Sequence, residues 1–226
     1  MTLDRKLYLL AFLITSFLLA SLFAIGAVFN TRRESRINSM VDEAYGNLRD
    51  MQTFMLMTDV YGTEMGCLAA QSKLQQLDQS IWDLGVRIDR YRVATEEFQR
   101  DPFYLDQKKV FNENEFLYLL LVSQLKRNCA QNSSVVLFFY RDSHTCPKCD
   151  DQSFVLSDIK RDAEDQVLIF SFDMDLGLTT LNLLAEYYGL DAYPCLVIGE
   201  QRHCGMQDRE FIVQQLCASD PAAGFC

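Results

Sequence analysis

The stretch FFYRDSHTCPKCDDQ, residues 138–152, places two cysteines two residues apart directly after an apolar run. The run begins at residue 134 and reads SVVLFFY, and its β-branched and aromatic residues predict a strand. The residues after it predict a helix that begins at the cysteine pair and extends to about residue 162. A pair in this setting allows three interpretations, which are redox chemistry, half of a metal site and a structural disulfide.

Strands and helices continue to alternate beyond this helix. Residues 167–172 and 195–198 predict two more strands, residues 178–189 a helix that ends at a glycine, and residues 208–216 a last helix. Gly199 and Glu200 predict a two-residue hairpin turn before a return strand at residues 201–204. The predicted order is therefore β-α-β-α-β-β-α, an α/β arrangement.

This half of the chain resembles the thioredoxin-like fold family over residues 132–218. The resemblance rests on a strand that leads into Cys146-Pro147-Lys148-Cys149, a helix that starts there, and Tyr193-Pro194 before the next strand. In that family the proline is cis and faces the active-site sulfurs, so the resemblance implies this role for Pro194. It also implies a thiol–disulfide oxidoreductase.

Elementary chemistry assigns different roles to the two cysteines. Cys146 lies at the predicted amino terminus of a helix, where unpaired N–H groups and the helix dipole favour a thiolate and lower a thiol pKa. We therefore expect Cys146 to be the nucleophile and Cys149, one turn further along, to be the resolving thiol. Lys148 is a possible modulator because its positive charge favours the thiolate. His144 is either a second modulator or an exposed loop histidine.

Several positions depart from the thioredoxin pattern. The inner residues are Pro-Lys rather than Gly-Pro, which resembles the oxidant and glutaredoxin-like branches, and Thr145 stands where thioredoxins carry tryptophan. Thioredoxin places a buried acid on the strand six residues before its first cysteine, and Tyr140 occupies that position here. Because that acid takes the proton of the second thiol, its absence argues against an efficient reductase unless Asp142 or Asp150 substitutes.

The chain has eight cysteines, an even number that favours disulfides and an oxidising compartment over a reducing one. Buried free thiols are the alternative interpretation. The eight are Cys67, Cys129, Cys146, Cys149, Cys195, Cys204, Cys217 and Cys226.

Three further bridges are candidates. If the helices on which Cys67 and Cys129 lie run antiparallel, their ends meet, and we expect a structural bridge there. The hairpin places Cys195 opposite Cys204, close to disulfide distance, although Cys195 follows Pro194 and is also a candidate third redox residue. Cys217 and Cys226 bracket a loop that a bridge would close, and the alternative is a free Cys226 in a mobile tail.

Metal and cofactor sites find little support in the sequence. A structural zinc site needs four ligands, usually as two close pairs, and the chain has one Cys-x-x-Cys pair and two histidines. The sequence shows neither a glycine-rich phosphate loop nor a dinucleotide fingerprint. The formal net charge of -10 argues against nucleic acid as a partner, because that binding needs clustered Lys and Arg. We expect no metal and no cofactor.

The amino-terminal region predicts a membrane anchor. Residues 7–29 form an uncharged apolar run of 23 residues, and about 20 such residues cross a bilayer as a helix. A cleaved signal peptide is the alternative, since Ala24-Ile25-Gly26 resembles a cleavage site. Basic residues flank the run on both sides, so the cysteines decide the orientation. We expect the amino terminus inside and the rest of the chain on the extracytoplasmic side.

The region between anchor and α/β domain predicts helices. Two apolar stripes with alternating steps of three and four residues run from Val41 to Met55 and from Ala70 to Tyr91. Asp101-Pro102 predicts the start of a third helix, whose apolar run at residues 116–122 predicts a buried face. We expect three parts: residues 1–32 as anchor, 33–130 as a helical, coiled-coil-like region, and 131–226 as the thioredoxin-like domain. We expect the helices either to pack against one another, or to serve as a spacer, as the contact surface of a dimer or as a binding surface for a partner protein.

The leading functional interpretation is a membrane-anchored thiol–disulfide oxidoreductase that acts on extracytoplasmic protein thiols and disulfides and is recycled by an unidentified redox partner. The alternative is a non-catalytic adaptor or accessory subunit in which CPKC forms a structural disulfide. The helical region favours this alternative, because a simple exchange enzyme does not need about 100 residues besides its thioredoxin-like domain. A cytoplasmic redox sensor would require the opposite topology.

Overall fold

The computed structural model describes residues 5–93, 101–129, 133–163, 166–219 and 226. The chain forms two compact units, Met1–Met40 and Val41–Cys226. The three-part division at residues 32 and 130 stays a prediction.

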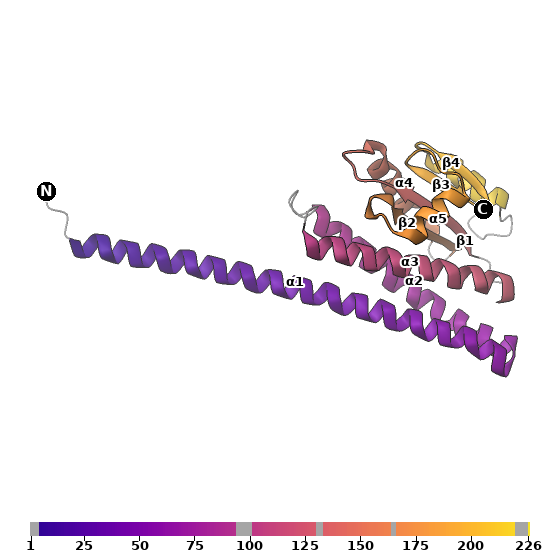
Figure 1. The fold of residues 1–226 in the computed structure, drawn as a ribbon, viewed down its shortest axis with the longest axis horizontal. Helices are drawn as coiled ribbons and strands as arrows, with labels where there is room; N and C mark the ends of the chain where they lie inside the picture. The colour runs from indigo at the N-terminus through magenta and orange to yellow at the C-terminus, as the bar shows by residue number, and fades with distance from the viewer. Residues whose placement is uncertain (1–4, 94–100, 130–132, 164–165, 220–225) are drawn as a thin grey trace. The chain divides into compact units, whose positions relative to one another are not determined.

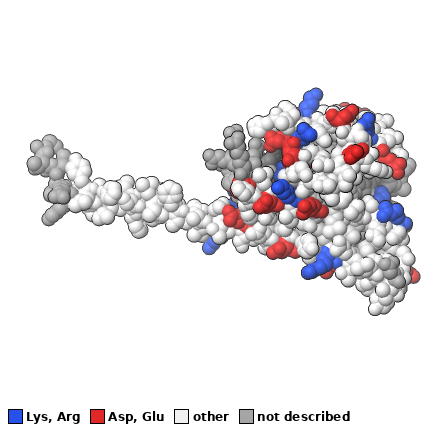
Figure 2. Space-filling model, viewed as in Figure 1, with Lys and Arg blue, Asp and Glu red and all other residues white. Residues whose placement is uncertain are grey.

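Helix α1, Arg5–Tyr61, includes both the apolar run and the first predicted stripe. Large side chains of the apolar run are exposed to solvent along its length, such as Phe17 at 72% and Phe23 at 77%. Among the described residues, this is the one helix that is long and apolar enough to cross a membrane. The apolar run at residues 7–29 has no acidic or basic residue and is drawn white in Figure 2.

Two further helices follow α1. Gly62 takes the left-handed region with φ 91°, which a glycine adopts without steric cost, and separates α1 from α2, Thr63–Val93. Helix α3, Pro102–Cys129, begins where the sequence predicts it, and the Phe103 N–H donates to Asp101 Oδ1 at 2.9 Å as a cap. Most residues of both predicted stripes are buried, whereas Val41 is half-buried and the side chain of Tyr91 lies outside the described residues. The buried ones are Ala44, Leu48, Met51 and Met55 from α1, and Ala70, Leu74, Leu77, Ile81, Leu84 and Ile88 from α2.

Helices α2 and α3 pack against each other and are linked covalently. Cys67 near the start of α2 forms a disulfide with Cys129, the last residue of α3, which confirms the predicted bridge. The Gln71 side chain donates to the Cys129 carbonyl at 3.0 Å next to this bridge. The two helices are therefore antiparallel neighbours (Figure 1).

The sheet has four strands in the order β2-β1-β3-β4. They are β1 Ser134–Tyr140, β2 Val167–Asp173, β3 Cys195–Ile198 and β4 Gln201–Cys204. β1 and β2 are parallel, whereas β3 is antiparallel to both β1 and β4, so the sheet is mixed. The predicted hairpin register is confirmed, with Ile198 opposite Gln201 and Cys195 opposite Cys204.

Helices α4, Pro147–Ala163, and α6, Arg209–Ser219, cover one face of this sheet. The short helix η3, Met174–Leu176, and α5, Thr179–Tyr187, follow β2. The core on the α4 face is apolar throughout and draws on strands and both helices: Val136, Phe138, Leu156, Ile159, Ala163, Val167, Leu196, Ile198, Ile212 and Leu216.

Helix α3 covers the free edge of the sheet. β2 is an edge strand, and such strands present unpaired N–H groups. Two of them find side-chain acceptors in α3: Ser171 N–H donates to Glu115 Oε1 at 2.6 Å and Asp173 N–H donates to Asn112 Oδ1 at 2.9 Å. Helix α3 and the sheet thus share hydrogen bonds within the Val41–Cys226 unit.

A buried ion pair joins α2 to α4. Lys160 Nζ lies 2.6 Å from Asp78 Oδ2 and donates to the Val167 carbonyl at 2.9 Å. Tyr118 of α3 donates its hydroxyl to the other Asp78 oxygen at 3.3 Å. Lys160 is 8% exposed and Asp78 9%, so both charges are buried.

Candidate functional site

The cysteine pair stands at the amino terminus of α4, directly after the loop that leaves β1. Pro147 is the first helical residue, where a missing N–H leaves no helical hydrogen bond unmade, and Asp150 supplies an acid in the first turn. The Asp142 carbonyl accepts from Thr145 N–H at 3.0 Å and from Cys146 N–H at 2.8 Å. This folds the loop so that the Cys146 side chain reaches the helix terminus.

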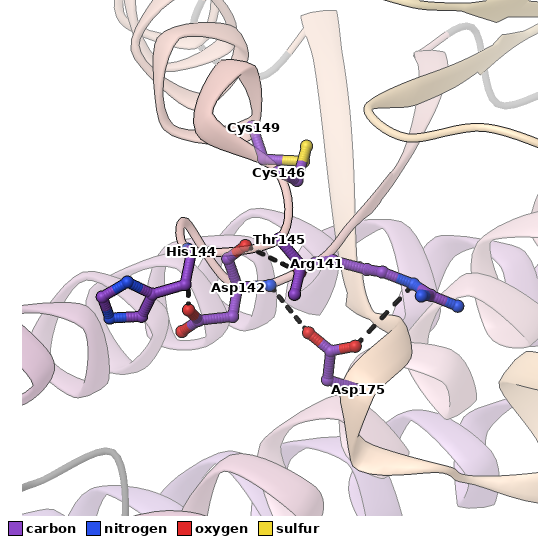
Figure 3. The surroundings of a disulfide bond; sticks show 7 residues. All are labelled: Arg141, Asp142, His144, Thr145, Cys146, Cys149 and Asp175. Atoms are coloured by element: carbon purple, nitrogen blue, oxygen red, sulfur yellow. Dashed lines mark hydrogen bonds and ion pairs between the residues drawn. A yellow bond between two sulfur atoms is a disulfide. The ribbon is translucent and has the colours of Figure 1, made fainter.

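Cys146 and Cys149 form a disulfide with an S–S distance of 1.99 Å (Figure 3). Cys146 is 5% exposed and Cys149 2%, and the Cys149 N–H donates to the Cys146 carbonyl at 3.0 Å. In the reduced form, the free N–H groups of the first helical turn would favour a thiolate at Cys146. The pair therefore lies at a helix amino terminus, where a thiolate is favoured, but is almost fully buried.

Pro194 is brought to the same end of the sheet. Its peptide bond with Tyr193 is cis, as the family resemblance implies. In the register of β1 with β3, Phe139 lies opposite Cys195, so Pro194, which directly precedes Cys195, lies at the end of the sheet where β1 leads into the CPKC loop. The Arg141 guanidinium lies 4.8 Å from the centre of the Tyr193 ring and links the two segments.

The loop before the pair is fastened by two aspartates. Asp175 of η3 accepts from the Asp142 N–H at 2.8 Å and lies 3.7 Å from Arg141 Nε (Figure 3). Asp142 Oδ1 accepts from the His144 N–H at 2.9 Å. The His144 ring points away from the two sulfurs in Figure 3 and is exposed. Lys148 is exposed as well, and the roles of both residues as modulators stay predictions.

A cavity of about 490 Å³ lies next to the pair, between α2, α3, α4 and the sheet. Cys149 forms part of its wall from α4, and Glu115 and Lys108 do so from α3. Trp82 of α2, the one tryptophan of the chain, also lines it. The volume falls in the range of small-molecule sites, roughly 300–1,000 Å³.

Buried ionisable groups gather on the α3 side of this cavity. Lys108 forms an ion pair with Asp173, and its ammonium lies 5.4 Å from the centre of the Tyr140 ring. Burial lowers the pKa of Lys108, but the nearby Tyr140 and Asp173 more than offset this, so the net pKa is raised. Burial also raises the pKa of Tyr140, which stands at the position of the family's buried acid.

Sequence reasoning missed the contribution of α3 to this site. Glu115 is 3% exposed, and burial raises its pKa well above the usual value, although the hydrogen bond from Ser171 N–H offsets part of this effect. The segment FNENEF, residues 111–116, carried a signal, because polar residues interrupt an apolar helix there. Asn112, Asn114 and Glu115 are all buried.

The remaining cysteines are also paired. Cys195 forms a disulfide with Cys204, with Cα atoms 3.9 Å apart, and Cys217 forms one with Cys226. Cys195 is fully buried, and its role as a third redox residue stays a prediction. Among the described residues, no group of three or more His, Cys, Asp and Glu side chains is arranged to hold a metal ion.

Comparison with known proteins adds little to this geometry. No protein-family model and no curated protein matches the chain. A solved structure described as that of a malarial protein is similar at 15% sequence identity and a TM-score of 0.33, and the match covers 39% of this chain and 98% of that chain. A similarity at this level supports no conclusion about fold or function.

Proposed function

We propose that the chain is a thiol–disulfide oxidoreductase of the thioredoxin-like fold, with Cys146 and Cys149 as its redox pair. The observation that carries the proposal is the Cys146–Cys149 disulfide at the amino terminus of α4, next to the central strand β1. The strand order, the helix that begins at the pair and the position of Pro194 opposite the end of β1 all support the family assignment.

In this mechanism Cys146 exchanges with the substrate and Cys149 resolves the intermediate. A Cys146 thiolate attacks a substrate disulfide, or a substrate thiolate attacks Cys146 in the disulfide, and both routes pass through a mixed disulfide. The substrates are protein thiols and disulfides, and a redox partner recycles the pair.

We place the reaction on the extracytoplasmic side of a membrane, with α1 as the anchor. The long apolar helix supports the anchor, and four disulfides support an oxidising compartment. After reduction of intact cells, an impermeant maleimide should label the cysteines of the chain. Labelling that requires permeabilised cells would place the domain inside and reject this topology.

The reduction potential of the pair is the first test. The full chain in detergent is equilibrated in glutathione buffers, and peptide mapping assigns the thiols of each cysteine. A value near about -120 to -200 mV marks an oxidant or isomerase, and one near about -270 mV a reductase. Replacing Cys146 with serine should abolish exchange in either case.

One observation favours the second candidate, a non-catalytic adaptor with CPKC as a staple. Both cysteines are almost fully buried, at 5% and 2% exposure, and a nucleophile needs access to its substrate. A pair that stays oxidised below about -300 mV would support the adaptor and reject the enzyme. In that case Cys146→Ser would still bind the partner.

A further inference from the structure

The cavity between α2, α3, α4 and the sheet has a largely aromatic wall. Seven aromatic side chains line its volume of about 490 Å³: Trp82, Tyr104, Phe111, Tyr118, Phe138, Tyr140 and Phe154. They come from all three helices and from strand β1. Aliphatic residues complete the apolar part of the wall: Ile81, Val86, Ile88, Leu156 and Ile169. A wall of this composition favours an occupant with a ring, because aromatic rings stabilise one another beyond the area that they bury.

The cavity is open to solvent. Phe154 of α4 lines it and is nevertheless 74% exposed, and Ser153 and the α2 residues Asp89 and Arg90 line it and are exposed as well. These residues mark a mouth between α2 and α4, through which a molecule can enter while the chain stays folded. Exposed apolar surface rimmed by polar residues is typical of ligand-binding grooves.

The walls of the cavity are held in place by contacts between the helices. At Gly85 of α2, a Cβ atom would lie 2.9 Å from Cζ of the Phe111 ring, so this ring of α3 occupies the place where another residue would carry a side chain. The buried pair Asp78–Lys160 joins α2 to α4. Such fixed walls are usual in small-molecule sites, which are largely formed before the ligand binds.

The protein neutralises the charged groups of the inner wall. Lys108 forms an ion pair with Asp173, and Asp78 forms one with Lys160. Burial raises the pKa of Glu115 well above its usual value and so favours the uncharged acid. A charged ligand would therefore leave water for an interior whose charges are already paired, which is costly. The remaining charged groups of the wall have both signs and favour neither anions nor cations: Asp89, Arg90, Arg141, Asp142 and Asp150.

We propose that the cavity is a binding site for a small uncharged molecule with an aromatic ring. Tyr140, Ser153 and Ser157 add hydroxyl groups to the wall, which can hydrogen-bond a hydroxyl or carbonyl group of the ligand. This site goes beyond the proposed thiol–disulfide exchange and does not rest on it. Cys149 lines the cavity, but Cys146, to which a substrate would be attached, does not.

Three probes with the same fluorinated ring test the class of ligand. The alcohol para-fluorobenzyl alcohol is uncharged, para-fluorobenzoate is an anion, and para-fluorobenzylammonium is a cation. The full chain in detergent is titrated with each probe, and the broadening of the fluorine NMR line reports binding. Detergent without protein gives the background from micelles. Trp82 gives a second readout in the wild type, because it is the one tryptophan of the chain and lines the cavity.

Two tryptophan substitutions on α4 locate the binding. Ser153→Trp fills the mouth of the cavity, and because Ser153 is exposed, the chain should still fold. Asp151→Trp is the matched control, since Asp151 is exposed on the same helix and does not line the cavity. Denaturant midpoints show whether both variants are folded, and the Trp82 readout of the wild type needs neither of them.

We expect the wild type and Asp151→Trp to bind the alcohol with a Kd on the order of 1 mM, a usual affinity for so few atoms. Ser153→Trp should bind it at least about tenfold more weakly, because the added ring takes the space of the probe. Both charged probes should also bind at least about tenfold more weakly than the alcohol. The alcohol should change the Trp82 emission over the same concentrations. Equal binding by wild type and Ser153→Trp, an unchanged Trp82 emission, or a charged probe that binds as tightly as the alcohol would each overturn the inference.

Discussion

The buried Asp78–Lys160 pair predicts how firmly the helical region is held on α4. We expect Asp78→Leu to destabilise the chain by about 3–5 kcal/mol, the usual result when one partner of a buried pair is removed. The reason is that Lys160, 8% exposed, would keep its charge in the interior with the Val167 carbonyl as an acceptor but without the carboxylate. Tyr118 would lose an acceptor as well.

The double variant Asp78→Leu/Lys160→Met removes both charges. Replacing a buried pair by apolar residues of similar size is often neutral or stabilising by about 1–4 kcal/mol, so most of the loss should be recovered. The control is the pair Arg209–Asp162, which has a similar separation of 2.7 Å but side chains that are 49% and 51% exposed. Its removal should change the free energy of unfolding by at most about 1 kcal/mol.

The assay is guanidinium unfolding of the full chain in detergent, followed by the fluorescence of Trp82. This residue lies on α2 one turn after Asp78, so its signal reports the packing of that helix. A loss below about 1 kcal/mol for Asp78→Leu, as for a surface pair, would refute the burial of these charges. It would also remove the basis for a cavity between α2 and α4.

Two further predictions concern the disulfides and Glu115. Removing Cys67–Cys129, which closes a loop of 62 residues, should destabilise the chain by about 4 kcal/mol if the bridge acts by reducing the entropy of the unfolded chain. Removing Cys217–Cys226, which closes a loop of 9 residues, should cost about 2.5 kcal/mol. Denaturant midpoints of the two double-serine variants measure both losses, and a larger loss for the shorter loop would contradict the prediction. Because burial raises the pKa of Glu115, the unfolded chain binds fewer protons than the folded chain above pH 4.5, the ordinary value for this group. The wild type should therefore lose stability relative to Glu115→Gln as pH rises from 4.5 towards the folded-state pKa, measured by urea unfolding across that range, and a constant difference would show that Glu115 does not titrate abnormally.

Local patterns in the sequence were sufficient for the strands, helices and hairpin register. The run at residues 134–140 and the Gly199-Glu200 turn each specify an element through residues that are adjacent in the chain. The Cys67–Cys129 bridge also followed, because antiparallel helices bring their opposite ends together. The placement of Cys146 at a helix amino terminus needed no information beyond the motif and its flanking residues.

The surroundings of the cysteine pair depend on contacts between residues far apart in sequence. Asp78 and Lys160 are 82 residues apart, and Glu115 and Ser171 are 56 residues apart. No periodicity encodes such pairs, since it reports which face of a helix is apolar and not what that face covers. Buried polar residues in α3 make sense only once β2 is known to be an edge strand whose N–H groups need acceptors.

The hydrogen bonds from the β2 edge to Asn112 and Glu115 bear on how this chain can be divided into fragments. A sheet fragment that begins at β1 would expose the Ser171 and Asp173 N–H groups, and unpaired edge groups invite pairing with another chain. Such a fragment should aggregate where the longer chain does not. Helix α3 is therefore part of the folding unit of the sheet, and it cannot be exchanged for another linker without a replacement for these two acceptors.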